Sequence, residues 1–303
     1  MSTDAIISRI NALRTKRNAV LLAHYYQRPE VQDIADFVGD SLDLSRKAAA
    51  TEADVIVFCG VHFMAETAKI LSPHKTVLMP DEHAGCPMAN MLTPRELREF
   101  KARHPGALTV AYVNCSAAIK AEVDICCTSA NAAKVVASLP KDREILFVPD
   151  QSLGDYINRT YGYSMVLWPG FCPTHHRFLV RDIDDMRAAH PGALLCVHPE
   201  CTREIIERAD FTGSTSQIIN FCSNSPATEF IIGTEEGILH PLRKRNPGKH
   251  FYHLSPLATC SNMKLTTLEK IMWCLEDMAY EIKLDETLRQ RAFNAVNRMI
   301  QIT

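Results

Sequence analysis

The sequence lacks several features that would each point to a particular class of protein. Its longest apolar runs, such as Val55–Cys59, are too short to cross a membrane. No two cysteines are spaced as Cys-x-x-Cys, which argues against a zinc ribbon and a thioredoxin-like site. The 35 acidic and 33 basic residues nearly balance, so the basic footprint of a nucleic-acid-binding protein is missing. With no secretory signal before Asp4, we expect a cytoplasmic protein that binds neither membrane nor nucleic acid.

The composition is that of an ordinary globular protein. The chain has 303 residues, 47% of them hydrophobic and 22% charged, which suits two or three domains with large cores. It also contains 11 cysteines, a high number for this length. In a reducing compartment, any special cysteines serve as metal ligands or catalysts rather than in disulfides, and the others are small buried hydrophobes.

Three of the cysteines occur at one period. Cys86, Cys172 and Cys260 are separated by 86 and 88 residues, and each follows an apolar run that ends near a proline. The same residue after the same kind of run, three times, indicates a triplicated unit. Three such units arranged around a pseudo-threefold axis would bring three thiolates to one point.

Other residues recur in the same register. The tetrapeptide His104–Ala107 returns 86 residues later as His190–Ala193. Four further sets follow the period: His24, Tyr112 and His198; Tyr26, Asn114 and Glu200; Asp36, Asp124 and Asp210; and Ser41, Ser129 and Thr215. We interpret the three aspartates as structural polar contacts and the other sets as the ends of strands or the starts of helices.

The order of the predicted elements gives the fold class. Short continuous apolar runs, typical of buried parallel strands, alternate with amphipathic helices. The predicted strands are 19–23, 54–59, 76–79, 108–111, 144–148, 164–168, 194–197, 229–232 and 250–254. We expect an α/β protein of three homologous α/β/α sandwich domains with parallel sheets around a pseudo-threefold axis. The domains would be 1–85 with the C-terminal helices 261–303, then 86–171, then 172–260. A helix from Pro29 through Phe37 is also expected.

Ligands of parallel α/β sheets bind beyond the carboxyl ends of the strands, where the repeated residues fall. Three thiolates there have few uses. Zinc would need a fourth ligand, such as a histidine. A [4Fe–4S] cluster held by three cysteines keeps one open iron, a Lewis acid suited to dehydration rather than to electron transfer. His175, three residues past Cys172, could also reach this cavity.

Hydroxyl side chains recur at the predicted helix starts. Each of Ser41, Ser129 and Thr215 alone is most simply an N-cap. Three of them around one cavity would instead suit an anionic substrate, because helix N-termini bind carboxylates and phosphates.

Several motifs resemble those of the quinolinate synthase family. They are Ala23–Gln27, Gly39–Ser41, Ala65–Leu71, Gly85–Ala89, Pro169–Cys172, His198–Cys201 and Gly213–Gln217. The resemblance implies three α/β/α domains around one [4Fe–4S] cluster and a transferase of de novo NAD biosynthesis. Such an enzyme condenses iminoaspartate with dihydroxyacetone phosphate to give quinolinate, phosphate and two waters. A transient contact with L-aspartate oxidase, which makes iminoaspartate, would be consistent with this activity.

The resemblance also carries residue roles onto this chain. The cluster ligands are Cys86, Cys172 and Cys260. The substrate-binding positions are His24, Ser41, Tyr112, Val113, Asn114, Ser129, His198, Pro199, Glu200 and Thr215. From their chemistry we assign acid–base catalysis to Tyr26 and Glu200, assisted by His198.

Two positions depart from the family pattern. Ala130 stands where many relatives have a second serine, so the resemblance does not carry over the minor contact of that serine. The segment Cys260–Met263 lacks the Cys-x-x-Cys-x-x-Cys run that some longer relatives use as a redox switch, and we expect no such control here.

Two alternatives stay open on the sequence. One is another iron–sulfur hydro-lyase acting on a different hydroxy acid. The other is a non-enzymatic module that binds zinc or senses iron.

Overall fold

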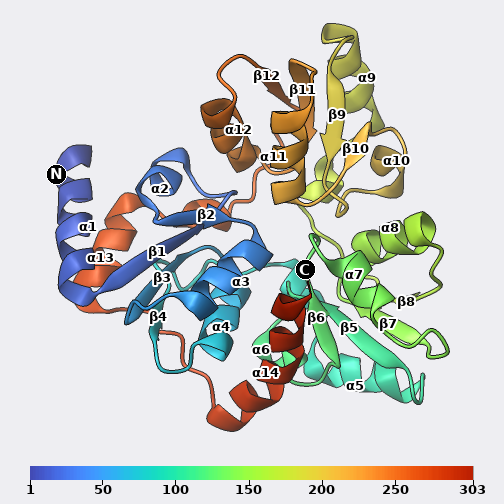
Figure 1. Cartoon of the computed structure of the whole chain (residues 1–303), viewed down its shortest axis with the longest axis horizontal. Helices are drawn as coiled ribbons and strands as arrows, with labels where there is room; N and C mark the ends of the chain where they lie inside the picture. The colour runs from blue at the N-terminus through green and yellow to red at the C-terminus, as the bar shows by residue number, and fades with distance from the viewer. Residues whose placement is uncertain (303) are drawn as a thin grey trace.

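A computed structural model describes residues 1–302 and contains three parallel four-stranded sheets. The sheets have the orders β2-β1-β3-β4, β6-β5-β7-β8 and β10-β9-β11-β12, so the same topology occurs three times. Their strands are β1 (Ala19–His24), β2 (Phe37–Gly39), β3 (Val55–Cys59), β4 (Thr76–Leu78), β5 (Leu108–Tyr112), β6 (Ile125–Cys127), β7 (Ile145–Val148), β8 (Val166–Leu167), β9 (Leu194–Val197), β10 (Phe211–Thr212), β11 (Glu229–Gly233) and β12 (His250–His253). Figure 1 shows the three units around the middle of the molecule, which confirms the predicted fold class.

The α-helices connect and cover these strands. They are α1 (Thr3–Arg17), α2 (Pro29–Ile34), α3 (Ser41–Ala50), α4 (His62–Leu71), α5 (Pro94–Ala102), α6 (Ala117–Lys120), α7 (Ala132–Ala137), α8 (Gln151–Tyr161), α9 (Val180–Ala189), α10 (Arg203–Ile206), α11 (Thr215–Asn224), α12 (Leu239–Arg245), α13 (Leu268–Asp277) and α14 (Glu286–Gln301). Residues 1–302 also contain four 3₁₀ turns, which are η1 (Met88–Met91), η2 (His175–Arg177), η3 (Glu236–Ile238) and η4 (Met263–Leu265). Across residues 1–302, no helix has both the length and the apolar character needed to cross a bilayer.

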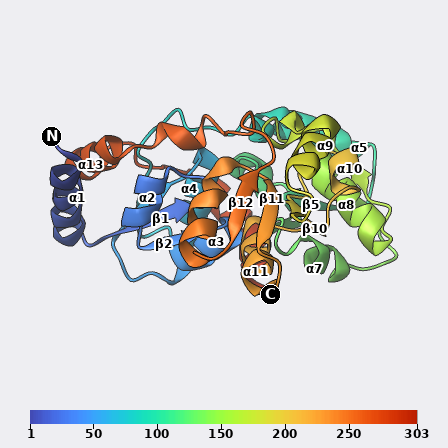
Figure 2. The ribbon, with the colours of Figure 1, turned by 90° about the horizontal axis from the view of Figure 1, so that it is seen from above.

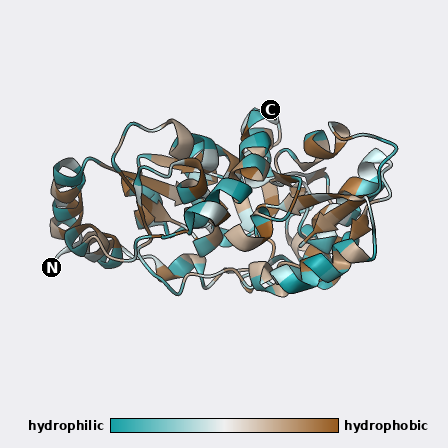
Figure 3. Ribbon diagram, turned by 90° about the horizontal axis from the view of Figure 1, so that it is seen from below, coloured by the Kyte–Doolittle hydropathy of each residue, from teal (hydrophilic) through white to brown (hydrophobic). Residues whose placement is uncertain are grey.

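The strands form the apolar interior of each unit. Figure 3 shows brown, hydrophobic strands inside and helices whose teal faces point outward. The central strands are almost completely buried; Leu21, Val110 and Ile231, for example, have no exposed surface. Burial on both faces explains why these segments are continuous apolar runs rather than alternating ones.

The period-related aspartates confirm their predicted structural role. A carboxylate oxygen of Asp36 accepts a hydrogen bond of 2.8 Å from the backbone N–H of Leu21 on β1. The equivalent bonds run from Thr109 to Asp124 and from Leu195 to Asp210, each over 2.7 Å. Each aspartate therefore ties the start of the first edge strand to the first central strand of its sheet.

The C-terminal helices lie in two places. Helix α13 packs on α1, and Figure 2 shows the two helices together at one end of the molecule. Helix α14 packs on β6 and α6 of the second unit as well as on α4 of the first. The predicted assignment of 261–303 to the first unit, like the other domain boundaries, stays a prediction.

Some local predictions were wrong. The helix expected through Phe37 ends at Ile34, and Phe37–Gly39 is the edge strand β2. Pro29 does begin this helix as predicted. Ser129 does not start a helix, because α7 begins three residues later with Asn131 as its N-cap.

Candidate active site

One cavity lies where the three units meet. It is lined by all three period-related cysteines and by a similar set of polar residues from each unit. The polar residues predicted from the sequence that line it are His24, Tyr26, Ser41, Tyr112, Asn114, Ser129, His198, Glu200 and Thr215. The structure thus brings these residues to one place. Val113 and Pro199 are buried beside it, but neither is among its lining residues.

The three cysteines in the cavity differ from the other eight. Cys86, Cys172 and Cys260 are partly exposed, whereas the other cysteines are buried, and none of the 11 forms a disulfide. Each of the three lies just before a 3₁₀ turn, η1, η2 or η4. The backbone N–H three residues later, in Ala89, His175 and Met263 respectively, hydrogen-bonds to the cysteine and favours its thiolate form.

These thiols suit a metal centre better than free thiol chemistry. Burial raises the pKa of Cys86 to about 12 and also raises the pKa of Cys172 and Cys260. Nucleophilic cysteines need the opposite shift. A bound cationic centre, in contrast, deprotonates its thiol ligands, and the backbone N–H groups already point at the sulfurs. Three thiols that line one cavity therefore fit a three-cysteine cluster.

Two histidines at strand ends are held as neutral hydrogen-bond donors. Nδ1 of His24 accepts the backbone N–H of Tyr26 over 3.1 Å, and Nδ1 of His198 accepts that of Glu200 over 3.3 Å. Burial lowers the pKa of both imidazoles to about 3. Each imidazole therefore carries its proton on Nε2. Nε2 of His198 lies 3.2 Å from the Ser129 hydroxyl oxygen.

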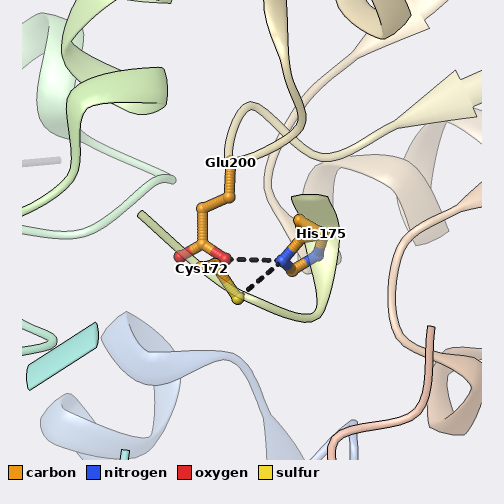
Figure 4. Close-up of side chains that lie close together, drawn as sticks. All are labelled: Cys172, His175 and Glu200. Atoms are coloured by element: carbon orange, nitrogen blue, oxygen red, sulfur yellow. Dashed lines mark hydrogen bonds and ion pairs between the residues drawn. The ribbon is translucent and has the colours of Figure 1, made fainter. Parts of the chain in front are cut away.

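Glu200 lies at the centre of a buried polar cluster. Figure 4 shows His175 facing both Cys172 and Glu200. Nδ1 of the histidine lies 2.7 Å from the Glu200 carboxylate and 3.2 Å from the Cys172 sulfur. Ligand atoms of these three residues lie within 4.8 Å of one another, close enough to hold a metal ion. Burial alone would raise the pKa of Glu200, but His175 and His198 hold it at about 2. The carboxylate is therefore ionised.

A chain of hydrogen bonds continues from His175 to Tyr26. Nε2 of His175 lies 2.8 Å from the Thr234 hydroxyl, which lies 2.6 Å from the Tyr26 hydroxyl. The Tyr26 oxygen also accepts a 3.0 Å bond from Thr215. Burial and the nearby Glu200 charge raise the pKa of Tyr26 well above its usual value. The phenol therefore keeps its proton.

The hydroxyls at two helix starts are not the N-caps that the simplest interpretation predicts. Asp40 caps α3 and Ser214 caps α11, while Ser41 and Thr215 are the first helical residues after these caps. Because the preceding residues satisfy the helix N–H groups, the hydroxyls of Ser41 and Thr215 are left to face the cavity.

Sequence reasoning missed the residues after the third strand of each unit. Thr234 and Glu235 follow β11, and Asp150 occupies the place equivalent to Glu235 after β7. Glu235 accepts the backbone N–H of Cys260 over 3.1 Å and pairs with Lys264 over 2.9 Å. These side chains differ in type between the units. Asp150 and Glu235 nevertheless stand at the same number of residues after the ends of β7 and β11, and this shared position next to a strand end is a signal that the sequence contains.

Fold and site together define a class of protein: an enzyme of three α/β units whose shared cavity combines three cysteine thiols with buried titratable side chains. The chain belongs to the quinolinate synthetase A family, whose model matches residues 8–301.

Curated relatives extend this match over the whole chain. A protein of Geobacter metallireducens named quinolinate synthase is 55% identical over 302 residues. The match covers 100% of this chain and 99% of the Geobacter protein. The quinolinate synthase of Desulforudis audaxviator is 54% identical, with 99% of each chain covered. The quinolinate synthase 1 of Methanosarcina acetivorans is 52% identical, and the match covers 100% of this chain and 99% of the Methanosarcina protein. The family resemblance predicted from the motifs is thereby confirmed.

Proposed function

We propose that the protein is a quinolinate synthase of NAD biosynthesis, which condenses iminoaspartate with dihydroxyacetone phosphate to give quinolinate, phosphate and two waters. The observation that carries the proposal is the convergence of three period-related cysteines and the repeated polar residues on one cavity. Family membership over residues 8–301 supports the particular reaction.

Cys86, Cys172 and Cys260 would hold one [4Fe–4S] cluster. With three protein ligands, such a cluster would supply an open iron as a Lewis acid. The N–H groups directed at each sulfur and the partial exposure of these three cysteines support this ligand set.

The remaining residues divide into groups that move protons and groups that bind anions. Condensation, isomerisation and ring closure all transfer protons. The ionised Glu200 suits the role of base, and the protonated Tyr26 that of acid, while His198 donates from Nε2. Three buried titratable groups with different protonation states in one cavity allow acid and base chemistry at one pH.

Both substrates carry negative charge, and the cavity offers donors for it. Ser41 and Thr215 stand at the N-termini of two ten-residue helices, where the backbone favours carboxylate or phosphate. Ser129, Asn114, Tyr112 and the Nε2–H of His24 would complete the binding set. Val113 and Pro199 would contribute through the backbone rather than through lining side chains.

A second candidate function rests on one observation. Within residues 1–302, Cys172, His175 and Glu200 are the one group close enough together to hold a single ion, which would favour a zinc-binding module. That arrangement leaves Cys86 and Cys260 without a role, although both line the same cavity.

One experiment separates the two functions. The protein is purified without oxygen, its iron, sulfide and zinc are counted, and quinolinate formation is measured. The proposed function predicts about four irons and four sulfides per chain and quinolinate that depends on both substrates. Zinc without sulfide, or a loaded cluster without quinolinate, would contradict it.

We also propose that this reaction takes place in the cytoplasm. A transient contact with L-aspartate oxidase would deliver the unstable iminoaspartate directly. Co-purification of the two proteins from cells, lost at high salt, would support the contact.

A further inference from the structure

The cavity meets solvent at the three segments that carry its cysteines. Cys86 lies in segment 1 (85–91), Cys172 in segment 2 (168–177) and Cys260 in segment 3 (257–263). Within residues 1–302, the cavity-lining residues that are exposed to solvent are Pro87, Arg177 and Ser261, one in each segment. The contacts between these segments therefore decide how openly a metal centre in the cavity faces water.

Segment 3 is hydrogen-bonded to both of the other segments through side-chain donors. Nδ2 of Asn262 donates to the carbonyl oxygen of Gly85 in segment 1 over 2.7 Å. Nη1 of Arg177 in segment 2 donates to the carbonyl oxygen of Leu257 in segment 3 over 2.8 Å, and that of Thr259 lies 3.5 Å away. Segment 3 is therefore fixed on both sides of its cysteine.

A third donor joins the two remaining segments. Nε1 of Trp168 in segment 2 donates to the carbonyl oxygen of Met91 in segment 1 over 2.8 Å. The backbone nitrogen of Phe171, also in segment 2, lies 3.4 Å from the Met91 sulfur. The side chains of Trp168, Arg177 and Asn262 thus link the three segments in a closed ring, which we call the donor ring.

We propose that the three side chains of the donor ring are positioning residues, which hold the cysteine segments together and thereby slow the loss of a [4Fe–4S] cluster from the cavity. This inference rests on the proposed function. It extends that function to three residues that are neither proposed ligands nor proposed substrate-binding residues.

The donor ring joins segments that lie far apart in the sequence. Its three bonds connect residues 177, 80 and 77 positions apart. A site whose ligands are held in place before the metal binds loses less conformational freedom on binding. Hydrogen-bonded neighbours of metal ligands commonly raise metal affinity by about 10- to 100-fold. The ring supplies such neighbours to all three cysteine segments.

The ring can be broken without removing other contacts of its side chains. Asn262 is the N-cap of η4, but its side chain makes no capping hydrogen bond. The Trp168 ring packs edge-on against Phe100, with 5.4 Å between the ring centroids, and Trp168→Phe keeps an aromatic ring for this contact. In the described part of the chain, the Arg177 guanidinium forms no ion pair. Each donor can therefore be removed with little effect on local packing.

Three variants each remove one donor of the ring: Trp168→Phe, Arg177→Met and Asn262→Ala. The cluster-loaded proteins are mixed with an excess of an iron chelator in the absence of oxygen, and cluster loss is followed by visible absorbance. We expect each variant to lose its cluster about 10-fold faster than the wild type. Arg177→Lys keeps a donor and a positive charge, so its rate should stay within about threefold of the wild-type rate.

Each variant has a matched control outside the ring. Trp273→Phe changes a tryptophan of α13 with 52% of its surface exposed. Arg181→Met changes an arginine that pairs with Asp185 of its own helix, α9. Asn90→Ala changes an exposed asparagine within segment 1. None of these three side chains lines the cavity, so we expect wild-type rates of cluster loss.

A role in folding alone would give another pattern. The variants would then lower the denaturant midpoint of the cluster-free protein, while cluster loss below that midpoint would proceed at the wild-type rate. A wild-type rate in any of Trp168→Phe, Arg177→Met and Asn262→Ala would overturn the inference, as would an equal acceleration in the controls. Equal rates in Arg177→Lys and Arg177→Met would overturn it as well, because the donor would then not matter.

The loss rates separate this inference from the proposed function. A wild-type enzyme that forms quinolinate while all variants keep their cluster equally long would refute the role of the donor ring alone. A cluster-loaded wild type that forms no quinolinate would refute the proposed function, and the loss rates would still decide the role of the ring.

Discussion

The Glu235 carboxylate accepts the backbone N–H of Cys260 over 3.1 Å, and the same side chain pairs with Lys264. Glu235 is completely buried, and Lys264 also donates to the backbone carbonyl of Tyr26 over 2.7 Å. One acidic side chain thus holds the segment of a candidate cluster ligand and, through Lys264, the backbone of a candidate catalytic residue.

Glu235→Gln should therefore weaken both folding and cluster retention. Breaking a buried pair leaves the Lys264 charge uncompensated, and we expect a loss of about 3 kcal/mol in the free energy of unfolding. Glu236→Gln is the matched control, since the side chain of this neighbour is 43% exposed and lies 3.9 Å from Lys264. Denaturant unfolding and iron counting on both variants measure the two effects. Equal stability of the two variants would show that the buried pair has no such role.

Replacing a candidate cluster ligand should remove the iron without unfolding the chain. Cys86→Ala, Cys172→Ala and Cys260→Ala should each lose bound iron and the associated visible absorbance. Cys274→Ala serves as control, because Cys274 is buried in α13 and does not line the cavity. If any of the three cavity variants kept a full complement of iron and sulfide, that cysteine would not be a ligand.

The two proposed proton-transfer groups can be tested by near-isosteric changes. Glu200→Gln and Tyr26→Phe should each lower kcat by about 10²- to 10⁴-fold, the usual contribution of general acid–base catalysis. The cluster spectrum should persist, since neither residue is a proposed ligand. Tyr161→Phe, at a tyrosine with 53% of its surface exposed, should have wild-type kcat. Wild-type kcat in Glu200→Gln or Tyr26→Phe would remove that residue from the mechanism.

Stability should fall as the pH drops below about 6.5. Burial lowers the pKa of His24 and His198 from 6.5 to about 3, so between these values the unfolded chain binds more protons than the folded one. Each imidazole then lowers the free energy of unfolding by up to about 1.4 kcal/mol for each unit by which the pH decreases. The lowered pKa of Glu200 adds a loss of the same sign below about 4.5.

Thermal unfolding of the cluster-free protein between pH 7 and pH 5 measures the histidine contribution. His24→Gln combined with His198→Gln should flatten the dependence. His83→Gln is the control, because the side chain of His83 is 83% exposed. An unchanged slope in the double variant would show that other groups bind the protons.

The central strands were predictable because they are buried on both faces. Leu194–Val197, for example, is a continuous apolar run and forms β9 with those bounds. The edge strands β2 and β10 contain three and two residues and stand next to the polar residues Asp36 and Asp210, so no continuous apolar run marks them. Phe37–Gly39 also follows a proline-initiated helix directly, which made a longer helix the simpler prediction.

The residues of the site were predictable where the same type of residue recurs at the equivalent position of each unit. Cysteines, hydroxyls and first-strand residues recur at one period and could be matched between units. Thr234 and Glu235 have no counterpart of the same type, since Asp150 replaces glutamate in the second unit. The contacts of Thr234 join positions 59 and 208 residues apart, which only the folded chain reveals.

The repeated strand order bears on how a small ligand can lie in the cavity. Three identical units would offer any ligand three equivalent poses, each related to the next by one step of rotation. Here Tyr26, Asn114 and Glu200 occupy the same place in the three units but differ in charge and proton content. The divergence of the units therefore removes this rotational degeneracy, so that the two proposed substrates would meet in a single orientation.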